Sequence, residues 1–348
     1  MAGKNIDTGM TALDEKAEAS RLLYEAAKSS WENRKGKLGE ILTPFDDFSG
    51  LRAVDVSKLP AGTFMGMGFD TIGTKTELAE RLGKHDTIAY DMFAMVCDDA
   101  VVRGGEAVLI GSNLEINKID LAVVRQLAKG YVGAAKEAGV AIINGEIAEV
   151  GSRVGGFGKC NYNWGASVIW FAKKEHMITG REIKAGQKII SFQEAGFRSN
   201  GFTLLRRVMD NSWTTKTLQQ ALTPSKIYSK AVVSMFGKAN ITGVAHITGG
   251  GIPEKLGRML KASGLGADLT NLYEPGELMQ TAIELGSVPI SDAYRTWNMG
   301  NGMMITTSEP DDLIAIAKKY GLNAKICGEI SNKKGIRLES YEDEKLVF

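Results

Sequence analysis

Residues 66–106 decide how this chain is organised. They read Gly66-Met-Gly-Phe-Asp-Thr-Ile-Gly-Thr-Lys75 and, after a short connection, Lys84-His-Asp-Thr-Ile-Ala-Tyr-Asp-Met-Phe-Ala-Met-Val-Cys-Asp-Asp-Ala-Val-Val-Arg-Gly-Gly-Glu106. The apolar run at 63–69 predicts a strand, and the small residues after it predict a tight turn. Apolar residues in 87–102 recur at spacings of three and four, which predicts a helix.

The turn after the first strand has the composition of a polyphosphate site. Asp70 ends the strand, and Thr71, Gly73, Thr74 and Lys75 follow it. Ligands commonly bind at such strand ends, where the lysine could neutralise phosphate and the threonines could donate hydrogen bonds. A tight turn with a surface lysine is an equally good interpretation of these residues alone. The turn matches neither the Walker loop nor the dinucleotide fingerprint.

The predicted helix carries acids that suit a metal ion. Asp91 and Asp98 are seven residues apart, about two helical turns, so they share a face, and Asp99 is adjacent. Acids that face one point repel each other unless a cation lies between them, and Mg²⁺ with phosphate oxygens suits that position. The alternative is a solvated acidic face, which the otherwise apolar helix disfavours.

Composition narrows the class of protein. A chain of 348 residues is expected to form two domains, and a net charge of +1 gives no nucleic-acid footprint. The three cysteines are far apart and form no metal or dithiol motif, which fits a reducing compartment. No secretory signal or membrane span is visible. We therefore expect a cytoplasmic protein with neither a nucleic acid nor a membrane as partner.

Strands and helices alternate along the chain, which predicts an α/β (α+β) fold. Residues 1–62 are expected to form a leader, with a flexible start at 1–9, a helix at 10–33 and irregular structure from 34 onward. A first α/β domain is predicted at 63–172, and a charged, turn-rich junction then opens a second at 173–348. Within the first domain we expect strands at 107–114, 140–144 and 164–172, and a helix at 121–138 that Gly139 ends.

Further candidate residues follow other strands. Glu146 and Glu149 come directly after the predicted strand 140–144 and could reach the same metal, or could simply lie at an exposed strand end. Asn200 precedes a predicted helix, where it could bind substrate or serve as the helix cap. His246 runs into three glycines that include Gly249 and Gly250. A lone histidine is more often a core residue, but the glycines favour a phosphate-binding turn.

Taken together, these segments resemble the phosphoribosylformylglycinamidine cyclo-ligase (aminoimidazole ribonucleotide synthetase) family. Asp70–Lys75 is similar to the family's Asp-Gly-Val-Gly-Thr-Lys, and Gly145–Glu149 to its Gly-Glu-Thr-Ala-Glu. Leu222–Tyr228, which reads Leu-Thr-Pro-Ser-Lys-Ile-Tyr, and the stretch 294–302 point to this enzyme rather than to its wider superfamily. The resemblance covers about residues 63–330.

The resemblance implies a two-domain fold and a homodimer whose N-terminal sheets join into a barrel, with a mixed C-terminal sheet. It implies ATP- and Mg²⁺-dependent ring closure of formylglycinamidine ribonucleotide in purine synthesis. The implied metal ligands are Asp70, Asp99 and Glu146, and Lys75, Asn200 and His246 would be catalytic. The implied residues for binding ATP and Mg²⁺ are Asp70, Gly73, Thr74, Lys75, Asp91, Glu146, Gly249 and Gly250.

Several positions differ from the family pattern. Asp98 stands where the family has asparagine, Arg198 stands where it has histidine, and 144–152 loses a glycine, a threonine and a proline. Two alternatives therefore remain. One is another ATP-dependent relative that phosphorylates an amide or acid, such as a hydrogenase-maturation or thiamin-phosphate kinase type. The other is an inactive nucleotide-binding paralogue.

Overall fold

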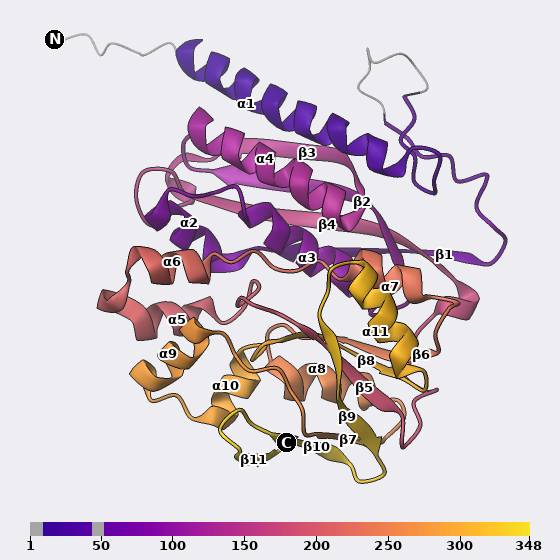
Figure 1. Cartoon of the computed structure of the whole chain (residues 1–348). Helices are drawn as coiled ribbons and strands as arrows, with labels where there is room; N and C mark the ends of the chain where they lie inside the picture. The colour runs from indigo at the N-terminus through magenta and orange to yellow at the C-terminus, as the bar shows by residue number, and fades with distance from the viewer. Residues whose placement is uncertain (1–9, 44–51) are drawn as a thin grey trace.

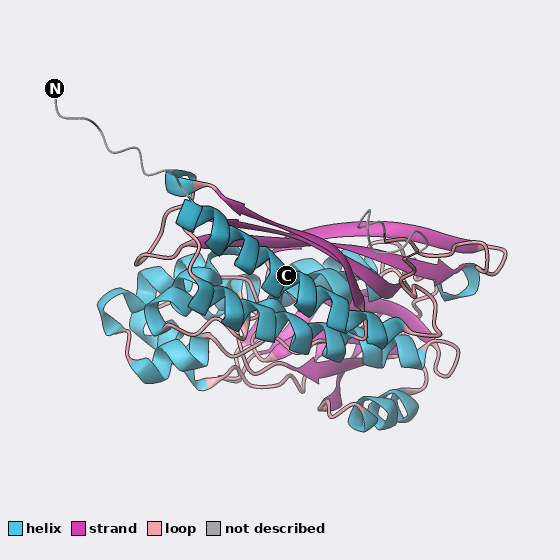
Figure 2. Cartoon of the chain, turned by 90° about the horizontal axis from the view of Figure 1, so that it is seen from above, coloured by secondary structure: helices cyan, strands magenta, loops and turns pink. Residues whose placement is uncertain are grey.

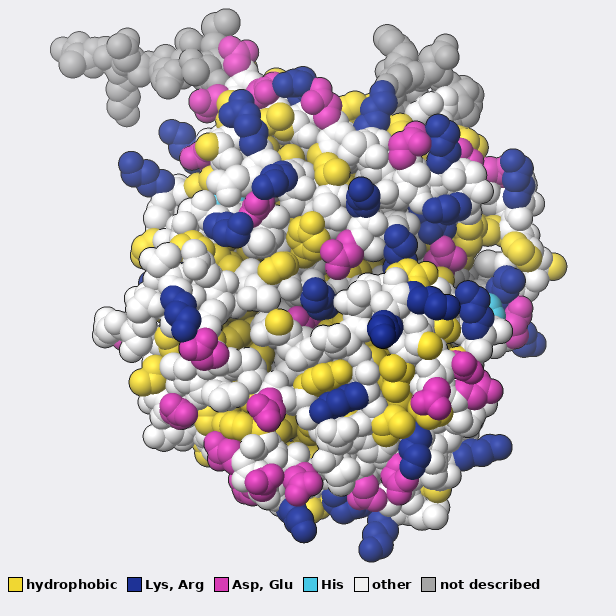
Figure 3. Space-filling view, in the orientation of Figure 1, with side chains coloured by type: hydrophobic (Ala, Val, Ile, Leu, Met, Phe, Trp, Pro, Cys, Tyr) yellow, Lys and Arg dark blue, Asp and Glu magenta, His cyan; other side chains and the backbone are white. Residues whose placement is uncertain are grey.

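The computed structural model describes residues 10–43 and 52–348, and the side chains from residue 13 onward. The predicted flexible start at 1–9, and residues 44–51 of the predicted irregular segment, lie outside these ranges. Among the described residues, no helix has the length and apolar character needed to cross a membrane. The face seen in Figure 3 carries basic and acidic side chains interspersed.

The described helices and strands alternate along the chain, as predicted. The α-helices are α1 (Met10–Ser29), α2 (Thr76–Leu82), α3 (Ile88–Val101), α4 (Leu121–Ala138), α5 (Phe202–Met209), α6 (Thr215–Ala221), α7 (Ser229–Met235), α8 (Gly251–Leu260), α9 (Glu277–Gly286), α10 (Ile290–Thr296) and α11 (Pro310–Lys319). The strands are β1 (Thr63–Thr71), β2 (Glu106–Ile116), β3 (Ala141–Glu149), β4 (Tyr162–Lys173), β5 (Lys188–Gln193), β6 (Ile241–His246), β7 (Gly266–Leu269), β8 (Asn301–Thr307), β9 (Ala324–Ser331), β10 (Gly335–Glu339) and β11 (Lys345–Val347).

The strands form two sheets, which lie one above the other in Figure 1. The first has the order β1-β4-β2-β3, with β2 and β3 parallel and the other pairs antiparallel. The second has the order β11-β10-β7-β9-β5-β8-β6 and is mixed, because β7 and β10 run parallel. The predicted α/β class and the mixed C-terminal sheet are confirmed.

Helix α3 lies at the centre of the molecule. It packs against β1, β4 and α4 on the side of the first sheet, and against α7 and β6 on the side of the second. Nearly all of its residues are buried, including Asp91 and Asp98. The apolar periodicity that predicted this helix therefore reflects contacts with both halves of the chain.

One face of the first sheet is open along β1. In Figure 2 its long strands run along one side of the molecule and the helices lie to the other. On β1, alternation places Met65, Met67 and Phe69 on this open face, where their exposed fractions are 66%, 56% and 73%. Gly66 points to the other face, where an added Cβ would lie 2.0 Å from the ring of Trp170.

Element boundaries differ from the prediction where backbone groups find unexpected partners. Strand β3 continues to Glu149 because residues 144–149 pair with β2, so Glu146 and Glu149 lie within the strand and not after it. Helix α7 begins at Ser229, and the N–H of Ser225, which precedes it, donates to Asp91. The short helices α2, α6 and α10 were not predicted, since seven residues show too little periodicity.

The start of α4 gives a test of local stability. The Asp120 carboxylate accepts from the N–H groups of Ala122 and Val123, and Gly139 ends the helix at φ 72°. We expect Asp120→Ala to lower the free energy of unfolding by about 1 kcal/mol, because two N–H groups lose their acceptor. Urea denaturation measures this change. Asp120→Asn is the control, since its side-chain oxygen still caps the helix, and equal losses in both variants would contradict the capping role.

Candidate active site

Two carboxylates face one cavity between the two halves of the molecule. Asp70 lies near the end of β1 and Asp99 in the last turn of α3, and both line a cavity of about 260 Å³. The cations Arg103, Lys255 and Arg258 line the same cavity. Acids that can hold a divalent cation beside basic groups that can bind an anion suit a metal-bound phosphate.

The pKa values of the two acids are shifted in opposite directions. Burial raises the pKa of Asp70, and the nearby charge of Asp99 raises it further, although the N–H of Thr71 donates to one carboxylate oxygen at 2.7 Å. Burial also acts to raise the pKa of Asp99, but the hydrogen bond from His246 opposes it, and that pKa lies below its ordinary value. Asp99 is thus the better stabilised anion of the pair.

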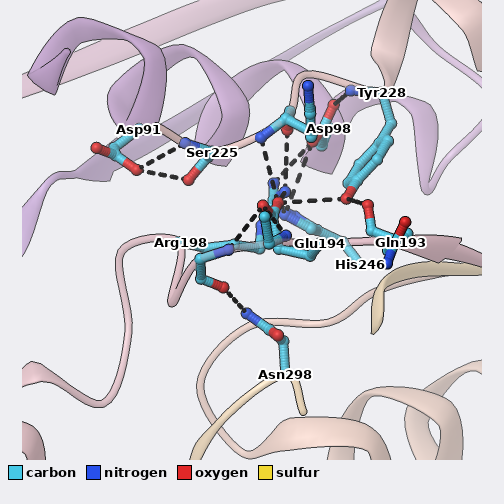
Figure 4. Close-up of polar contacts among 12 residues, drawn as sticks. Asp91, Asp98, Gln193, Glu194, Arg198, Ser225, Tyr228, His246 and Asn298 are labelled. Carbon is cyan, nitrogen blue, oxygen red and sulfur yellow. Dashed lines mark hydrogen bonds and ion pairs between the residues drawn. The ribbon is translucent and has the colours of Figure 1, made fainter. Parts of the chain in front are cut away.

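A buried cluster around Arg198 includes Asp98, Glu194 and His246 (Figure 4), and it reaches Asp99 through the His246 ring. Arg198 Nη2 lies 2.8 Å from Asp98 Oδ2 and 2.7 Å from His246 Nε2. Its Nη1 donates to Glu194 Oε2 at 2.7 Å and to the carbonyl of Lys226 at 2.9 Å. His246 Nδ1 in turn lies 2.7 Å from Asp99 Oδ1. The side chains of Arg198 and His246 are both buried.

Asp98 joins α3 to the second half of the chain. Its Oδ1 accepts from the N–H groups of Tyr228 and Ser229 at 2.9 and 2.8 Å, where α7 begins. Its Oδ2 accepts from Arg198, and its side chain is fully buried. The carboxylate therefore caps a helix of the other half, and nothing in this placement gives it an open side toward a metal.

Asp91 makes a second link of the same kind. Its Oδ1 accepts from Lys75 Nζ at 2.7 Å. It also accepts from the N–H and hydroxyl of Ser225, as Figure 4 shows. Lys75 also donates to the carbonyl of Thr223 at 2.8 Å and is fully buried. Asp91 and Asp98 share a face as predicted, but each is enclosed by protein. Contact of Lys75 with phosphate would require it to leave this ion pair.

The expected grouping of Glu146 with Asp70 and Asp99 does not occur within one chain. Asp70 aligns with Ala166, Ser112 and Gly145 across the sheet, whereas Glu146 aligns with Thr71. Neighbouring strand residues point to opposite faces, so Glu146 lies on the face away from Asp70 and three strands distant, about 14 Å. Among the described residues no three acidic, histidine or cysteine side chains form a metal-binding group.

The predicted glycine turns converge on one another. The Asn200 side chain lies beside Gly249: a Cβ added to Gly249 would be 3.4 Å from Asn200 Nδ2. The carbonyl of Ser199 lies beside Gly73: a Cβ added to Gly73 would be 3.7 Å from that oxygen. Gly250 has φ 91°, a conformation that favours glycine. The Asn200 Oδ1 is buried and has no hydrogen-bond partner among the described residues.

Thr74 and Gly73 face a different cavity from Asp70. They line a space of about 640 Å³ together with Glu80 and Arg206. Burial raises the pKa of Glu80 to about 7. The turn after β1 thus lies between two cavities, because Asp70 lines one of them and Gly73 and Thr74 line the other.

Several residues of the site carried no signal in the sequence. Glu194, the partner of Arg198, lies in an unremarkable segment, and Lys255 and Arg258 sit on an amphipathic helix like many surface cations. The glycine turn before α8 could have indicated Lys255 and Arg258, because this turn brings the start of α8 to the end of β6, which carries His246.

Family comparisons agree with this architecture. The AIR synthase related protein N-terminal domain matches residues 53–162, and the corresponding C-terminal domain matches 184–340. Two solved structures share the fold: Escherichia coli HypE, a hydrogenase maturation protein, and thiamine-monophosphate kinase from Stenotrophomonas maltophilia. HypE has a TM-score of 0.66 and is 15% identical, and the match covers 95% of this chain and 96% of HypE. The kinase also has a TM-score of 0.66 and is 13% identical, and the match covers 90% of this chain and 96% of the kinase. The chain is therefore an AIR synthase-related protein.

Curated relatives define the family more closely. Phosphoribosylformylglycinamidine cyclo-ligase of Pyrococcus furiosus is 31% identical over 93% of this chain and 94% of its own length. The enzyme of Thermococcus kodakarensis is 31% identical over 94% of this chain and 96% of its own length. The enzyme of Oceanobacillus iheyensis is 30% identical over 96% of this chain and 97% of its own length. The chain belongs to the phosphoribosylformylglycinamidine cyclo-ligase family.

Adjacent acids on α3 are expected to respond differently to substitution. Asp98→Ala leaves buried Arg198 without one of its two carboxylates, and we expect a loss of about 3–5 kcal/mol in the free energy of unfolding. Asp99→Asn, on the exposed side of the same turn, should change it by less than about 0.5 kcal/mol. Urea unfolding of both variants measures the difference, and similar losses would contradict the distinct placement of the two acids.

Proposed function

We propose that this protein closes the imidazole ring of aminoimidazole ribonucleotide, using ATP and formylglycinamidine ribonucleotide and releasing ADP and phosphate. The observation that carries the proposal is the likeness to cyclo-ligases over nearly the whole chain, at about 30% identity. The paired carboxylates beside the cations of the cavity support it, because the reaction handles a metal-bound polyphosphate and a phosphorylated substrate.

The chemistry calls for charge neutralisation and placement. Transfer of phosphate to the amide oxygen makes that oxygen a leaving group, and the neighbouring nitrogen then attacks the carbon, so no enzyme nucleophile is needed. Bound Mg²⁺ would supply charge neutralisation on the phosphate oxygens. Asp70 and Asp99 fit it: each has one carboxylate oxygen held by protein and the other without a partner among the described residues.

The remaining residues would bind and orient the substrates. Arg103, Lys255 and Arg258 would neutralise phosphate groups in the cavity, a role that the enclosed Lys75 does not take in this structure. Asn200, with its unpartnered side-chain oxygen, would accept from a donor group of the substrate. His246 acts on Asp99 through its Nδ1, so we assign it to the metal side of the site.

A coupled assay tests the reaction. Purified protein is mixed with MgATP and formylglycinamidine ribonucleotide, and ADP and aminoimidazole ribonucleotide are quantified. We expect both products in equal amounts. ADP formed only with another amide or acid would identify a different ATP-dependent relative. Nucleotide binding without turnover would identify an inactive paralogue.

Asp99→Asn tests the metal role. Removing the negative charge should lower kcat by about a hundredfold or more, since a metal contributes several kcal/mol of charge stabilisation. The control is Asp311→Asn, an exposed acid on α11 that is remote from the cavity. Full activity of the Asp99 variant at saturating Mg²⁺ would exclude this residue as a ligand.

We further propose that the protein is a homodimer joined through the open face of the first sheet. Met65, Met67 and Phe69 form an exposed apolar row there, and such a row favours association. Facing sheets of two copies would then close into the barrel that the family resemblance implies.

Met67→Glu should convert the dimer to a monomer, because burying a carboxylate between two apolar faces is unfavourable. Light scattering coupled to size-exclusion chromatography measures the mass. Leu285→Glu is the control, since Leu285 is also exposed, at 55%, but lies on α9 of the other half. A monomeric wild type would remove the proposal, and a dimeric Met67 variant would place the interface elsewhere.

A further inference from the structure

The hydrogen-bond capacity of Arg198 is almost fully used by protein. A guanidinium only donates, and each terminal nitrogen carries two hydrogens. Nη1 has the Glu194 carboxylate and the carbonyl of Lys226 as acceptors, and Nη2 has Asp98 and His246. Nε alone lacks a partner in the described structure. The second hydrogen of Nη2 therefore has one acceptor available, the Nε2 atom of His246.

This contact selects the form of the imidazole. If Nε2 accepts from Arg198 at 2.7 Å, it must present its lone pair, because two donors cannot face each other at that distance. The ring hydrogen is then on Nδ1, which lies 2.7 Å from Asp99 Oδ1 and donates to it. Arg198 thus acts on Asp99 through the ring of His246.

We infer that Arg198 is a positioning residue that fixes His246 in the Nδ1–H tautomer and thereby holds Asp99 with its free oxygen toward the cavity. The inference deepens the proposed function, on which it rests for the role of Asp99 as a Mg²⁺ ligand. Hydrogen bonds behind a ligand commonly set its orientation in this way. The arrangement uses Arg198, which stands where the family resemblance implies a histidine.

A purely structural role for Arg198 is the competing explanation. The same guanidinium pairs with Asp98 and Glu194, and both pairs are fully buried. Loss of Arg198 would therefore destabilise the protein whatever happens at His246. The test consequently needs a measurement on the imidazole itself, and a control that disturbs the same cluster without touching the ring.

The tautomer can be read directly by NMR. Long-range nitrogen–proton correlations of isotope-labelled histidine distinguish Nδ1–H from Nε2–H, and only His85 and His176 accompany His246 in the sequence. His246→Asn removes one signal and so assigns it. We expect Nδ1–H for His246 in the wild type. Nε2–H would overturn the inference without any further variant.

Arg198→Met and Arg198→Lys then test the cause. Methionine keeps much of the volume but donates nothing, so the His246 signal should change to a mixture of forms or to Nε2–H. Lysine lacks the planar fork and should restore the signal partly at most. Glu194→Gln is the matched control, because it removes the negative charge of a buried partner of Arg198 that does not contact His246. An unchanged His246 signal in folded Arg198→Met would overturn the inference.

Binding of Mg²⁺ gives a second measurement independent of turnover. With a non-hydrolysable ATP analogue present, calorimetry should show affinity for Mg²⁺ about ten- to a hundredfold weaker in Arg198→Met. In the His246→Asn background the amide can still donate to Asp99, so the further change of Arg198 should have little effect. Equal effects of Arg198→Met in both backgrounds would mean that it does not act through His246.

These measurements separate the inference from the proposed function. If the protein forms no aminoimidazole ribonucleotide but the tautomer and the Mg²⁺ affinity respond as described, the positioning role stands and the substrate assignment fails. If the product forms and the His246 signal is the same in the wild type and in Arg198→Met, the proposed function stands and the positioning role fails.

Discussion

The ion pair between Asp98 and Arg198 is the interaction on which the site depends. Both side chains are fully buried, and they come from opposite halves of the chain. A buried charge without a partner is strongly unfavourable, and separation of the two halves would leave both Asp98 and Arg198 without this partner. With Asp91 and Lys75 nearby, the pair fixes α3 between the sheets. The helix that carries Asp99 is therefore held from both sides.

Adjacent residues on α3 have different tasks because a helix turns about 100° per residue. Asp98 points into the interface and accepts from the start of α7, while Asp99 points into the cavity beside Asp70. Asp98 and Arg198, which stand where the family resemblance implies asparagine and histidine, thus contact each other. In this structure the two departures compensate each other's charge, and they belong to one cluster.

Patterns within a single element were readable from the sequence. The helices at 88–101 and 121–138 followed from apolar spacing and from the glycine that ends α4, and the α/β class followed from their alternation with strands. The position of Asp70 at a strand end also followed, whereas its grouping with Asp99 was implied by the family resemblance. Sequence likeness then supplied the family.

The pairing of the site residues could not be predicted from the sequence, because the partners are far apart in the chain. Arg198 meets Asp98 across a separation of 100 residues, and Lys75 meets Thr223 across 148. Glu146 was misplaced because β3 is longer than its apolar run, and a residue within a strand faces the side that its register dictates. Charge and spacing do not reveal whether a lysine or an acid is already paired.

The cap that Asp98 provides to α7 bears on how the chain can fold and be divided. The first N–H groups of that helix find their acceptor in the other half of the protein, and not in a residue that precedes them. A C-terminal half made alone would begin α7 with unsatisfied donors and a buried arginine facing one carboxylate fewer. Although each half has its own sheet, each therefore depends on the other for hydrogen-bond partners that it cannot supply alone.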